Sequence, residues 1–415
     1  MMRTSLLLAL GTVTAVGALA ACTSSAESGT GANSIGASTL APASSAHASS
    51  RTATTTAPTR PRPSTSSPAP PTAATAQQVF ASMSERQRVG QLLMVDCPTT
   101  YVGQATTAAI TQYAVGSVIL DGTSYAGVAE TRAVADRLQA LAPRRTRLFV
   151  ATDQEGGLVQ RLQGPGFTRI VSAVDQGGIR PATLQGYAYG WGQQLRQAGV
   201  NVNLAPVLDT VPAGFGSNPP IGDLDRQFGS TPAAVAAPGV AVLRGMAAAG
   251  VDATVKHFPG LGRVHGNTDT TSGVTDTVTT RHDAYLAPFR AAIAAGTPFV
   301  MMSTAIYARI DPGTPAAFSR TIVTGMLRGD LGFGGVIISD DVGGAAQVSG
   351  YSVGQRAVDF IAAGGDVVLT VDAAQAGVMS AALLQRAAAD PAFKRQVDAA
   401  ALLVLQAKQA RDLLS

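Results

Sequence analysis

The sequence predicts an α/β protein built as a (β/α)8 barrel of the TIM type, and three observations lead to this prediction. Eight short apolar runs recur along the chain and are separated by Ala-rich, helix-like segments. The runs are continuously apolar, as expected of parallel strands that are buried on both faces. Each run ends in polar residues, which the mouth of a barrel accommodates and its core does not.

The expected strands are assigned from these runs. They begin near Gln91, Gly116, Arg147, Val200, Ala253, Pro298, Gly335 and Asp366. Helices are expected between them, among others over Ala126 to Leu141, Ala233 to Gly250 and Gly354 to Gly364. The polar residues that end the strands are Asp96, Asp121, Asp153, Asp209, Lys256-His257, Ser303-Thr304, Asp340 and Asp372.

An open, doubly wound sheet is the alternative fold, because a strand count alone does not close a barrel. A dinucleotide-binding version of that fold is disfavoured, since no G-x-G-x-x-G opens a helix after the first strand. The G-x-x-x-x-G-K-[ST] phosphate loop is absent as well.

The N-terminal segment is typical of an exported bacterial lipoprotein. Arg3 precedes an apolar stretch that leads to Leu19-Ala20-Ala21-Cys22, which has the form of a lipobox. We therefore expect a signal peptide over residues 1–21 and a lipid on Cys22. This lipid would anchor the protein at the bacterial cell envelope, on the outer face of the cytoplasmic membrane. An ordinary signal peptide with a chance Cys is the alternative.

The next segment, residues 22–75, consists mainly of Ser, Thr, Ala and Pro and is predicted to be a disordered tether. Residues 76–415 are predicted to form one catalytic domain, and Cys97 is expected there as a buried free thiol. The formal charge of +4 is scattered without a basic block, which argues against a nucleic-acid partner. No protein partner is required by any feature of the sequence.

The segment Met326 to Gly343, MLRGDLGFGGVIISDDVG, carries the strongest chemical signal. It reads as a helix end, a Gly-rich turn and an apolar strand that ends in Asp340 and Asp341. A carboxylate held at a barrel mouth by a stiff strand is well placed to attack an anomeric carbon. The run resembles the nucleophile signature of glycoside hydrolase family 3, G-(aliphatic)3-[ST]-D. The resemblance implies that Asp340 is the nucleophile, while Asp341 is expected to orient or hydrogen-bond.

Two further segments resemble the β-N-acetylhexosaminidase branch of that family. DQEGGLVQR, from Asp153 to Arg161, is similar to its sugar-binding loop, which implies that these two end residues contact the ligand. IGDLDRQFG, from Ile221 to Gly229, is similar to I-G-D-R-S-F-G but has two extra residues before Arg226. Arg226 is expected to bind a sugar hydroxyl pair or a carboxylate.

The segment KHFPGLGRVHGNTD, residues 256–269, matches that branch only in part. The branch has K-H-F-P-G-H-G, four variable residues and then D-S-H, in which the last His is the acid/base and the Asp polarises it. Lys256 and His257 match and are expected to bind substrate, but Asn267 and Asp269 replace the Asp–His dyad. Three readings stay open: Asp269 is the acid, His265 is the acid, or neither is.

The predicted function is a retaining glycoside hydrolase that releases terminal β-linked N-acetylhexosamine from cell-wall or related glycans. No paired Cys or His has metal-ligand spacing, so neither a metal nor another cofactor is expected. One alternative is a glycan-binding lipoprotein on a barrel that has lost efficient turnover. The other is a phosphorylase, or a hydrolase of unsubstituted β-glycosides.

Overall fold

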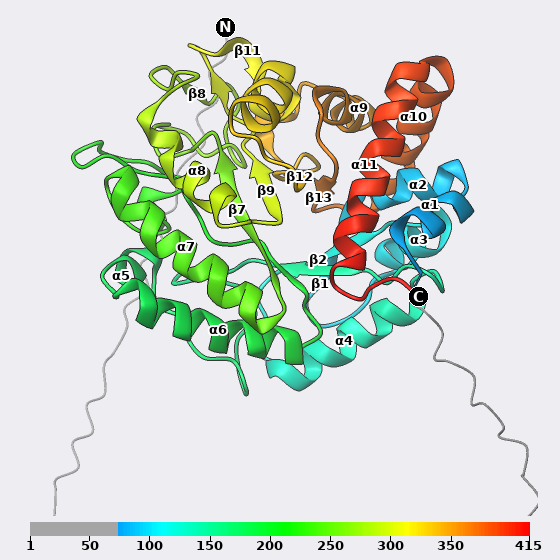
Figure 1. The fold of residues 1–415 in the computed structure, drawn as a ribbon, viewed down its shortest axis with the longest axis horizontal. Coiled ribbons are helices and arrows are strands. Elements are labelled where there is room, and N and C mark those ends of the chain that lie inside the picture. Colours follow the sequence, from blue (N-terminus) through cyan, green and yellow to red (C-terminus); the bar gives the residue numbers. More distant parts are fainter. Residues whose placement is uncertain (1–73) are drawn as a thin grey trace, which may run out of the picture. The chain divides into compact units, whose positions relative to one another are not determined.

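The structure is a computed structural model that describes residues 74–415. The predicted signal peptide, Cys22 and nearly all of the tether lie outside these residues. Eight parallel strands form the central sheet (Figure 1). They are β1 (Leu93–Pro98), β2 (Ser117–Asp121), β3 (Phe149–Thr152), β6 (Val202–Asn203), β7 (Asp252–Phe258), β9 (Phe299–Met302), β12 (Val336–Ser339) and β13 (Val368–Thr370). Each of the eight predicted apolar runs supplies one of them.

The sheet curls into a nearly closed barrel. Its strand order is β12-β9-β7-β6-β3-β2-β1-β13. The two ends meet through a parallel bridge between Ile338 and Val367, where the Ser339 N–H also donates to the Val367 carbonyl at 2.9 Å. The predicted barrel is therefore confirmed, and the open doubly wound alternative is wrong.

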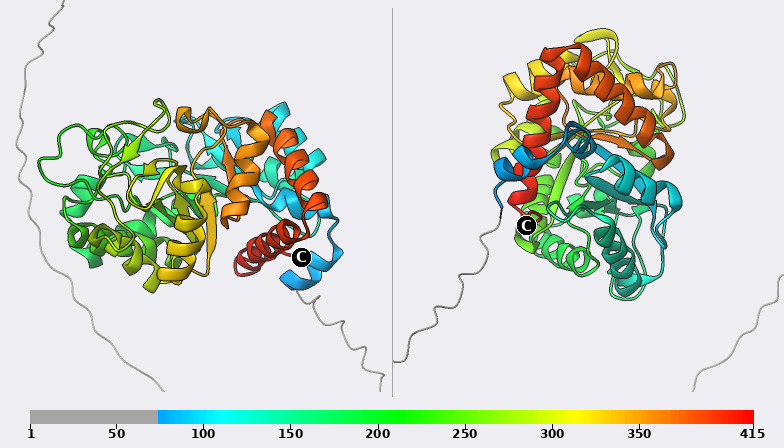
Figure 2. Two further views of the ribbon diagram at one scale, coloured as in Figure 1. Left: turned by 90° about the horizontal axis from the view of Figure 1, so that it is seen from above. Right: turned by 90° about the vertical axis from the view of Figure 1, so that its right-hand side faces the viewer.

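Helices lie on the outside of this barrel (Figure 2). They are α1 (Ala76–Ser82), α2 (Glu85–Gln91), α3 (Gln104–Tyr113), α4 (Gly127–Leu141), α5 (Ala173–Gly177), α6 (Pro181–Gln197), α7 (Pro232–Ala249), α8 (Ala287–Ala294), α9 (Val353–Ala363), α10 (Ala376–Ala389) and α11 (Pro391–Gln409). The three predicted helices correspond to α4, α7 and α9. Local sequence sets their ends: α7 starts at the N-cap Thr231 with Pro232 at its first position, and Gly250 ends it in the left-handed conformation.

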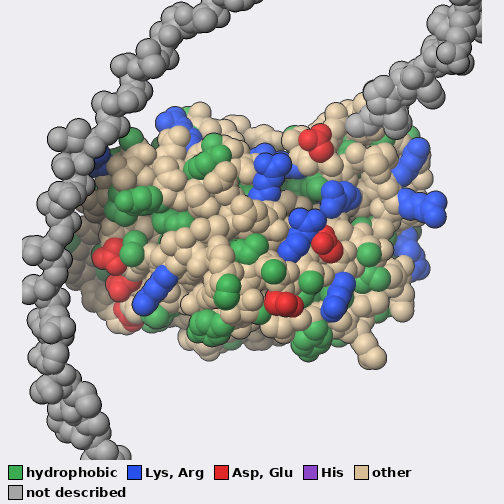
Figure 3. All heavy atoms as spheres, turned by 90° about the horizontal axis from the view of Figure 1, so that it is seen from below, with side chains coloured by type: hydrophobic (Ala, Val, Ile, Leu, Met, Phe, Trp, Pro, Cys, Tyr) green, Lys and Arg blue, Asp and Glu red, His purple; other side chains and the backbone are tan. Residues whose placement is uncertain are grey.

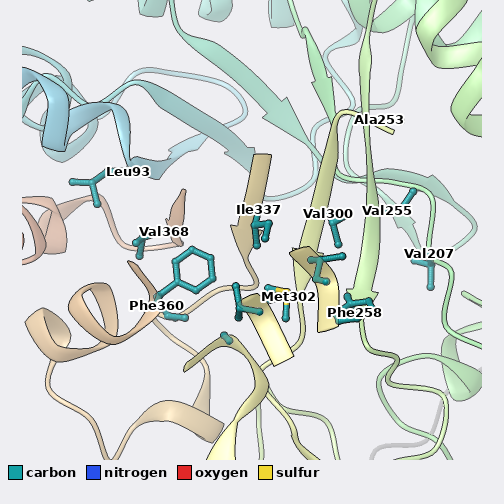
Figure 4. Close-up of a cluster of buried hydrophobic side chains, with 14 of the residues drawn as sticks. Leu93, Val207, Ala253, Val255, Phe258, Val300, Met302, Ile337, Phe360 and Val368 are labelled. Carbon is teal, nitrogen blue, oxygen red and sulfur yellow. The ribbon is translucent and has the colours of Figure 1, made fainter. Parts of the chain in front are cut away.

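The strands are apolar on both faces because each face meets a different apolar layer. Along β2, Ile119 belongs to the cluster inside the barrel, whereas Val118 and Leu120 belong to the layer between strands and helices. Figure 4 shows part of that outer layer, in which Ile337 and Phe360 lie together. This double burial explains why the runs show no alternation with polar residues.

The free thiol of Cys97 is buried in the outer layer, as predicted, and burial raises its pKa to about 12.

Lys408 of α11 is fully buried at the end of the barrel where the strands begin, opposite to the end where they finish. Its ammonium donates to Gln91 Oε1 at 2.7 Å and to the Gly116 carbonyl at 2.8 Å. The pKa of Lys408 is lowered to about 7 by this burial.

Short strands outside the barrel were not predicted, because two- to five-residue segments carry no periodic signal. They are β4 (Gln154–Gly156), β5 (Val159–Gln160), β8 (Thr275–Asp276), β10 (Ile306–Tyr307) and β11 (Asp311–Pro315). β4 and β5 pair as a hairpin directly after β3, inside the DQEGGLVQR segment. Figure 3 shows one face on which basic side chains are interspersed with apolar, polar and a few acidic ones, in keeping with a scattered charge.

Candidate active site

A pocket of about 410 Å³ opens at the C-terminal ends of the barrel strands. Its apolar floor is the top of the inner barrel cluster, with Ile119, Leu204, Met301 and Leu369. Its walls are polar and charged, and they contain Asp121, Asp153, Arg161, Arg226, Lys256, His257, Asn267, Asp269, Asp340 and Asp341. The mouth of the barrel therefore holds the pocket, as the fold predicts.

The alternation of side chains along a strand decides which strand-end residues reach this pocket. Asp121 comes two residues after the inward-facing Ile119, and Asp340 comes two residues after the inward-facing Ile338. Residues two apart share a face, so both carboxylates point to the barrel axis at the mouth. Asp209 and Asp372 also follow strands or their extensions, but neither lines the pocket.

Four charged side chains form a network along one wall. The Lys256 ammonium lies 2.5 Å from Asp153 Oδ1 and 2.7 Å from Glu155 Oε1. Arg226 donates to both oxygens of Glu155, at 2.9 Å from Nε and 2.8 Å from Nη2. Arg226 thus does bind a carboxylate in a bidentate manner, and that carboxylate belongs to the protein. The network holds both cations in place beside the cavity.

Glu155 is the residue of this network that sequence reasoning missed. Burial by itself would raise the pKa of Glu155, but Arg226 and Lys256 together hold that pKa well below its usual range. The pKa values of Arg226 and Lys256 are raised in turn, because their carboxylate neighbours outweigh the effect of burial. All three groups are therefore charged near neutral pH. The sequence did contain a signal for Glu155, since it is an acidic residue two positions after the matched Asp153 and therefore on the same face of the chain.

His257 is oriented by a carboxylate that does not reach the pocket itself. Asp209 is completely buried, and its Oδ2 lies 2.6 Å from Nδ1 of His257. Its other oxygen accepts from the backbone N–H groups of His257 at 3.2 Å and Leu261 at 2.7 Å. The ring therefore presents its Nε2 edge to the cavity. Asp209 was noted as a strand-end residue, but no role was predicted for it.

The two consecutive aspartates after β12 differ in their surroundings. The Asp341 carboxylate accepts from three backbone N–H groups, those of Gly343 at 2.8 Å, Gly344 at 2.8 Å and Val371 at 3.0 Å. Asp340 accepts one backbone bond, from Asp341 at 3.0 Å. The Asp341 carboxylate oxygens thus bind backbone N–H groups, whereas the Asp340 carboxylate remains available to a ligand.

Burial raises the pKa of Asp340 to about 6. The nearby His257 and Lys256 oppose this shift, and Asp269 adds to it when its carboxyl is ionised. Asp340 is thus mostly ionised at neutral pH, which a nucleophilic carboxylate requires.

The two candidate acids, Asp269 and His265, lie in different surroundings. Asp269 lines the pocket. The exposed His265 lies outside the pocket lining and stacks on Phe215, with ring centroids 4.4 Å apart and planes 5° from parallel. Its Nδ1 lies 3.2 Å from the Ser217 carbonyl. Asp269, and not His265, is brought together with Asp340. The predicted ligand contacts Asp153, Arg161, Arg226, Lys256 and His257 all lie in the pocket wall.

Comparison with known proteins extends these observations. Residues 84–406 match the model of the glycosyl hydrolase family 3 N terminal domain. A β-hexosaminidase from Stenotrophomonas maltophilia (strain R551-3) is 36% identical over 264 residues, which is 62% of this chain and 76% of that protein. The family match contains all eight strands of the barrel.

Solved structures of other proteins have a similar fold. The crystal structure of a β-N-acetylhexosaminidase from Beutenbergia cavernae DSM 12333 superposes with a TM-score of 0.78 at 50% identity, covering 79% of this chain and 99% of that one. A family 3 β-N-acetylglucosaminidase from Paenibacillus sp. str. FPU-7 has a TM-score of 0.73 at 32% identity, covering 80% of this chain and 63% of that one. The family match over most of the barrel, together with these relatives, shows that the chain belongs to glycosyl hydrolase family 3.

Proposed function

We propose that this protein is a retaining β-N-acetylhexosaminidase with Asp340 as its nucleophile and Asp269 as its acid/base. The observation that carries the proposal is that both carboxylates line one cavity of about 410 Å³. Relatives that bear the names β-hexosaminidase and β-N-acetylhexosaminidase support this substrate class. Retaining glycosidases use two such groups about 5–5.5 Å apart.

The sugar at the non-reducing end of a glycan occupies the cavity. The ammonium of Lys256, the guanidinium of Arg226 and the Nε2 edge of His257 bind its hydroxyls from one wall. Arg161 lies in the wall as well, and its buried Nε has no hydrogen-bond partner among residues 74–415. A buried donor of this kind gains most from a ligand oxygen.

The reaction proceeds in two steps. An oxygen of Asp340 attacks the anomeric carbon while the proton of Asp269 passes to the departing glycosidic oxygen, which leaves a glycosyl ester on Asp340. The Asp269 carboxylate then removes a proton from water, whose oxygen displaces Asp340 from the anomeric carbon. The sugar is released with its β configuration, and Asp269 is again protonated.

A glycan-binding protein without efficient turnover is the second candidate. The replacement of the family's Asp–His dyad by Asn267 and Asp269 favours it. Loss of the general acid lowers the rate roughly 10²–10⁴-fold. It leaves the side chains that would bind the sugar in place, so such a barrel would still bind sugar.

One experiment separates the two candidates. The full chain is incubated with nitrophenyl N-acetyl-β-glucosaminide and with N,N′-diacetylchitobiose. The proposed enzyme cleaves both and releases the β-anomer first. Cleavage of the aryl substrate alone shows that no acid operates, and sugar binding without any cleavage supports the binding protein. Addition of phosphate tests for a phosphorylase, which would yield a sugar phosphate.

We also propose that residues 1–21 direct export and that Cys22 carries a lipid, with residues 22–75 as the tether between the membrane and a catalytic domain over 76–415. The lipobox form of Leu19-Ala20-Ala21-Cys22 supports this location at the cell envelope. Labelling of cells with an alkynyl fatty acid tests it. The label is expected on the natural protein and not on Cys22→Ala, and labelling of both excludes Cys22 as the lipid site.

A further inference from the structure

The acid loop is bound to the segment that follows the nucleophile. Gln347 lies in the single-turn helix η5 (Ala346–Val348), seven residues after Asp340, and is buried. Its side-chain Oε1 accepts from the Val274 N–H at 2.8 Å, and its Nε2 donates to the Val274 carbonyl at 3.2 Å. Its backbone N–H donates to the Thr268 carbonyl at 3.0 Å.

Its neighbour Ala346 completes this contact. The Ala346 N–H donates to the carbonyl oxygen of Asp269 itself, at 3.0 Å. We refer to these four bonds, from Ala346 and Gln347 to residues 268, 269 and 274, as the clasp. The clasp joins the backbone of the acid to the chain that carries the nucleophile.

The start of the same loop is held from another side. The buried Asn218 donates from Nδ2 to the carbonyls of Leu261 at 2.9 Å and Val264 at 2.8 Å. His265 lies between the two attachments, whereas Asp269 lies within the clasp. The loop is thus held near its start by Asn218 and near Asp269 by the clasp.

We propose that Gln347 is a positioning residue that sets the separation between Asp269 and Asp340. This inference rests on the proposed role of Asp269 as the acid/base. Proton transfer to a leaving oxygen needs a heavy-atom distance near 2.6–3.2 Å, and a misplacement of about 1 Å costs on the order of 10²-fold in rate. Loss of the Gln347 side-chain bonds is therefore expected to impair proton donation more than nucleophilic attack.

The chain contains a matched control for this side chain. Gln139 of α4 makes the same pair of bonds to one residue, accepting from the Leu148 N–H at 2.9 Å and donating to the Leu148 carbonyl at 3.0 Å. This pair precedes β3 and so lies at the opposite end of the barrel from the pocket. Gln347→Leu and Gln139→Leu each delete one such pair of bonds, with the same change of side chain.

The test uses aryl N-acetyl-β-glucosaminides whose leaving groups range from nitrophenol to methylphenol. The value of kcat/KM reports the first step, in which a poor leaving group needs the acid and a good one does not. Gln347→Leu is expected to lower kcat/KM roughly tenfold or more on the poor leaving group and less than about threefold on the nitrophenyl substrate. Gln139→Leu is expected to affect both substrates equally and weakly. Equal losses on all substrates for Gln347→Leu would overturn the proposal.

A second variant guards against a folding defect in the first. Ala346→Pro removes the N–H that donates to the Asp269 carbonyl, and Ala345 already has φ −61° and ψ 126°, which suits a residue before proline. It is expected to show the same dependence on the leaving group. A folded Ala346→Pro protein without that dependence contradicts the inference.

Asp269→Asn distinguishes this inference from the proposed function. If Asp269→Asn loses activity only on poor leaving groups but the clasp variants do not, Asp269 is the acid and Gln347 does not position it. If Asp269→Asn shows no such dependence, the acid assignment fails and the role of Gln347 fails with it.

Discussion

Nδ1 of His257 lies 2.6 Å from Oδ2 of Asp209, in a part of the barrel where the Asp209 side chain has no exposure to solvent. This buried pair fixes one ring nitrogen as a donor and leaves the other to face the sugar pocket. Burial raises the pKa of Asp340, and the neighbouring His257 opposes this rise.

Asp209→Asn is expected to weaken catalysis through both effects. The Asn side chain no longer offers a carboxylate oxygen to Nδ1, so the ring loses the partner that orients it and its lowering effect on the pKa of Asp340 is weakened. The acidic limb of the pH profile of kcat/KM therefore moves to higher pH, and kcat/KM at pH 7 falls roughly 10-fold or more. Asp252→Asn is the control, since Asp252 is buried at the other end of β7 and pairs with Arg411. A profile that keeps its midpoint in Asp209→Asn argues against this role.

The pH profile of the natural protein follows from Asp340. Because burial raises the pKa of Asp340 to about 6, its carboxylate is increasingly protonated below that pH and cannot attack. We expect kcat/KM to fall about tenfold per pH unit below pH 6, on a substrate with a good leaving group. Circular dichroism over the same range checks that the fold persists. An acidic limb centred near pH 4 would show that Asp340 has an ordinary carboxyl pKa, or that another group is the nucleophile.

Asp269→Asn and His265→Ala are expected to differ strongly. Asp269 lines the pocket with Asp340, whereas His265 stacks on Phe215 outside it. The Asp269 change should slow chitobiose cleavage roughly 10²–10⁴-fold, and the His265 change less than about fivefold. The initial rates of cleavage of the nitrophenyl glycoside and of N,N′-diacetylchitobiose measure this difference. A larger loss in His265→Ala would transfer the acid role to the imidazole.

Lys408 is expected to make stability depend on pH. Its pKa is about 7 in the folded protein and near 10.5 in the unfolded chain, so above pH 7 the unfolded chain binds more protons. The free energy of unfolding therefore rises from pH 7 towards pH 10, by on the order of 1 kcal/mol per pH unit from this group. Below pH 7 the cost of burying the charged ammonium is fully present.

Urea unfolding of the natural protein and of Lys408→Met between pH 6 and pH 9 measures this contribution as a difference in slope. Lys394→Met is the control, because Lys394 is 40% exposed and pairs with Asp398 on the surface. Parallel curves for the natural protein and Lys408→Met would mean that Lys408 stays charged in the folded state.

The barrel strands could be predicted because each lies in a continuous apolar run, and burial on both faces gives a parallel strand that pattern. The run before Asp340 and the run before Asp121 each became a strand with its carboxylate at the mouth. The short strand β8 escaped prediction because it pairs with the distant β10. The strands β10 and β11 pair with each other but are too short to carry a periodic signal.

The residues that line the pocket and those that hold them in place were predicted in part. Sequence motifs pointed to Asp340 and Lys256 because the residue type and the spacing are both specific. Glu155 and Gln347 were missed, since their roles depend on partners 71 and 73 residues away. Nothing in the local sequence around Gln347 indicates that it binds Val274.

The sequence by itself determined which segments become buried strands and which side chains can carry charge at their ends, because burial and alternation are properties of a few consecutive residues. Only the tertiary structure decided between Asp269 and His265 as neighbours of Asp340. The two lie four residues apart on one loop, and the contacts of that loop with Phe215, Asn218 and Gln347 determine which side chain enters the pocket.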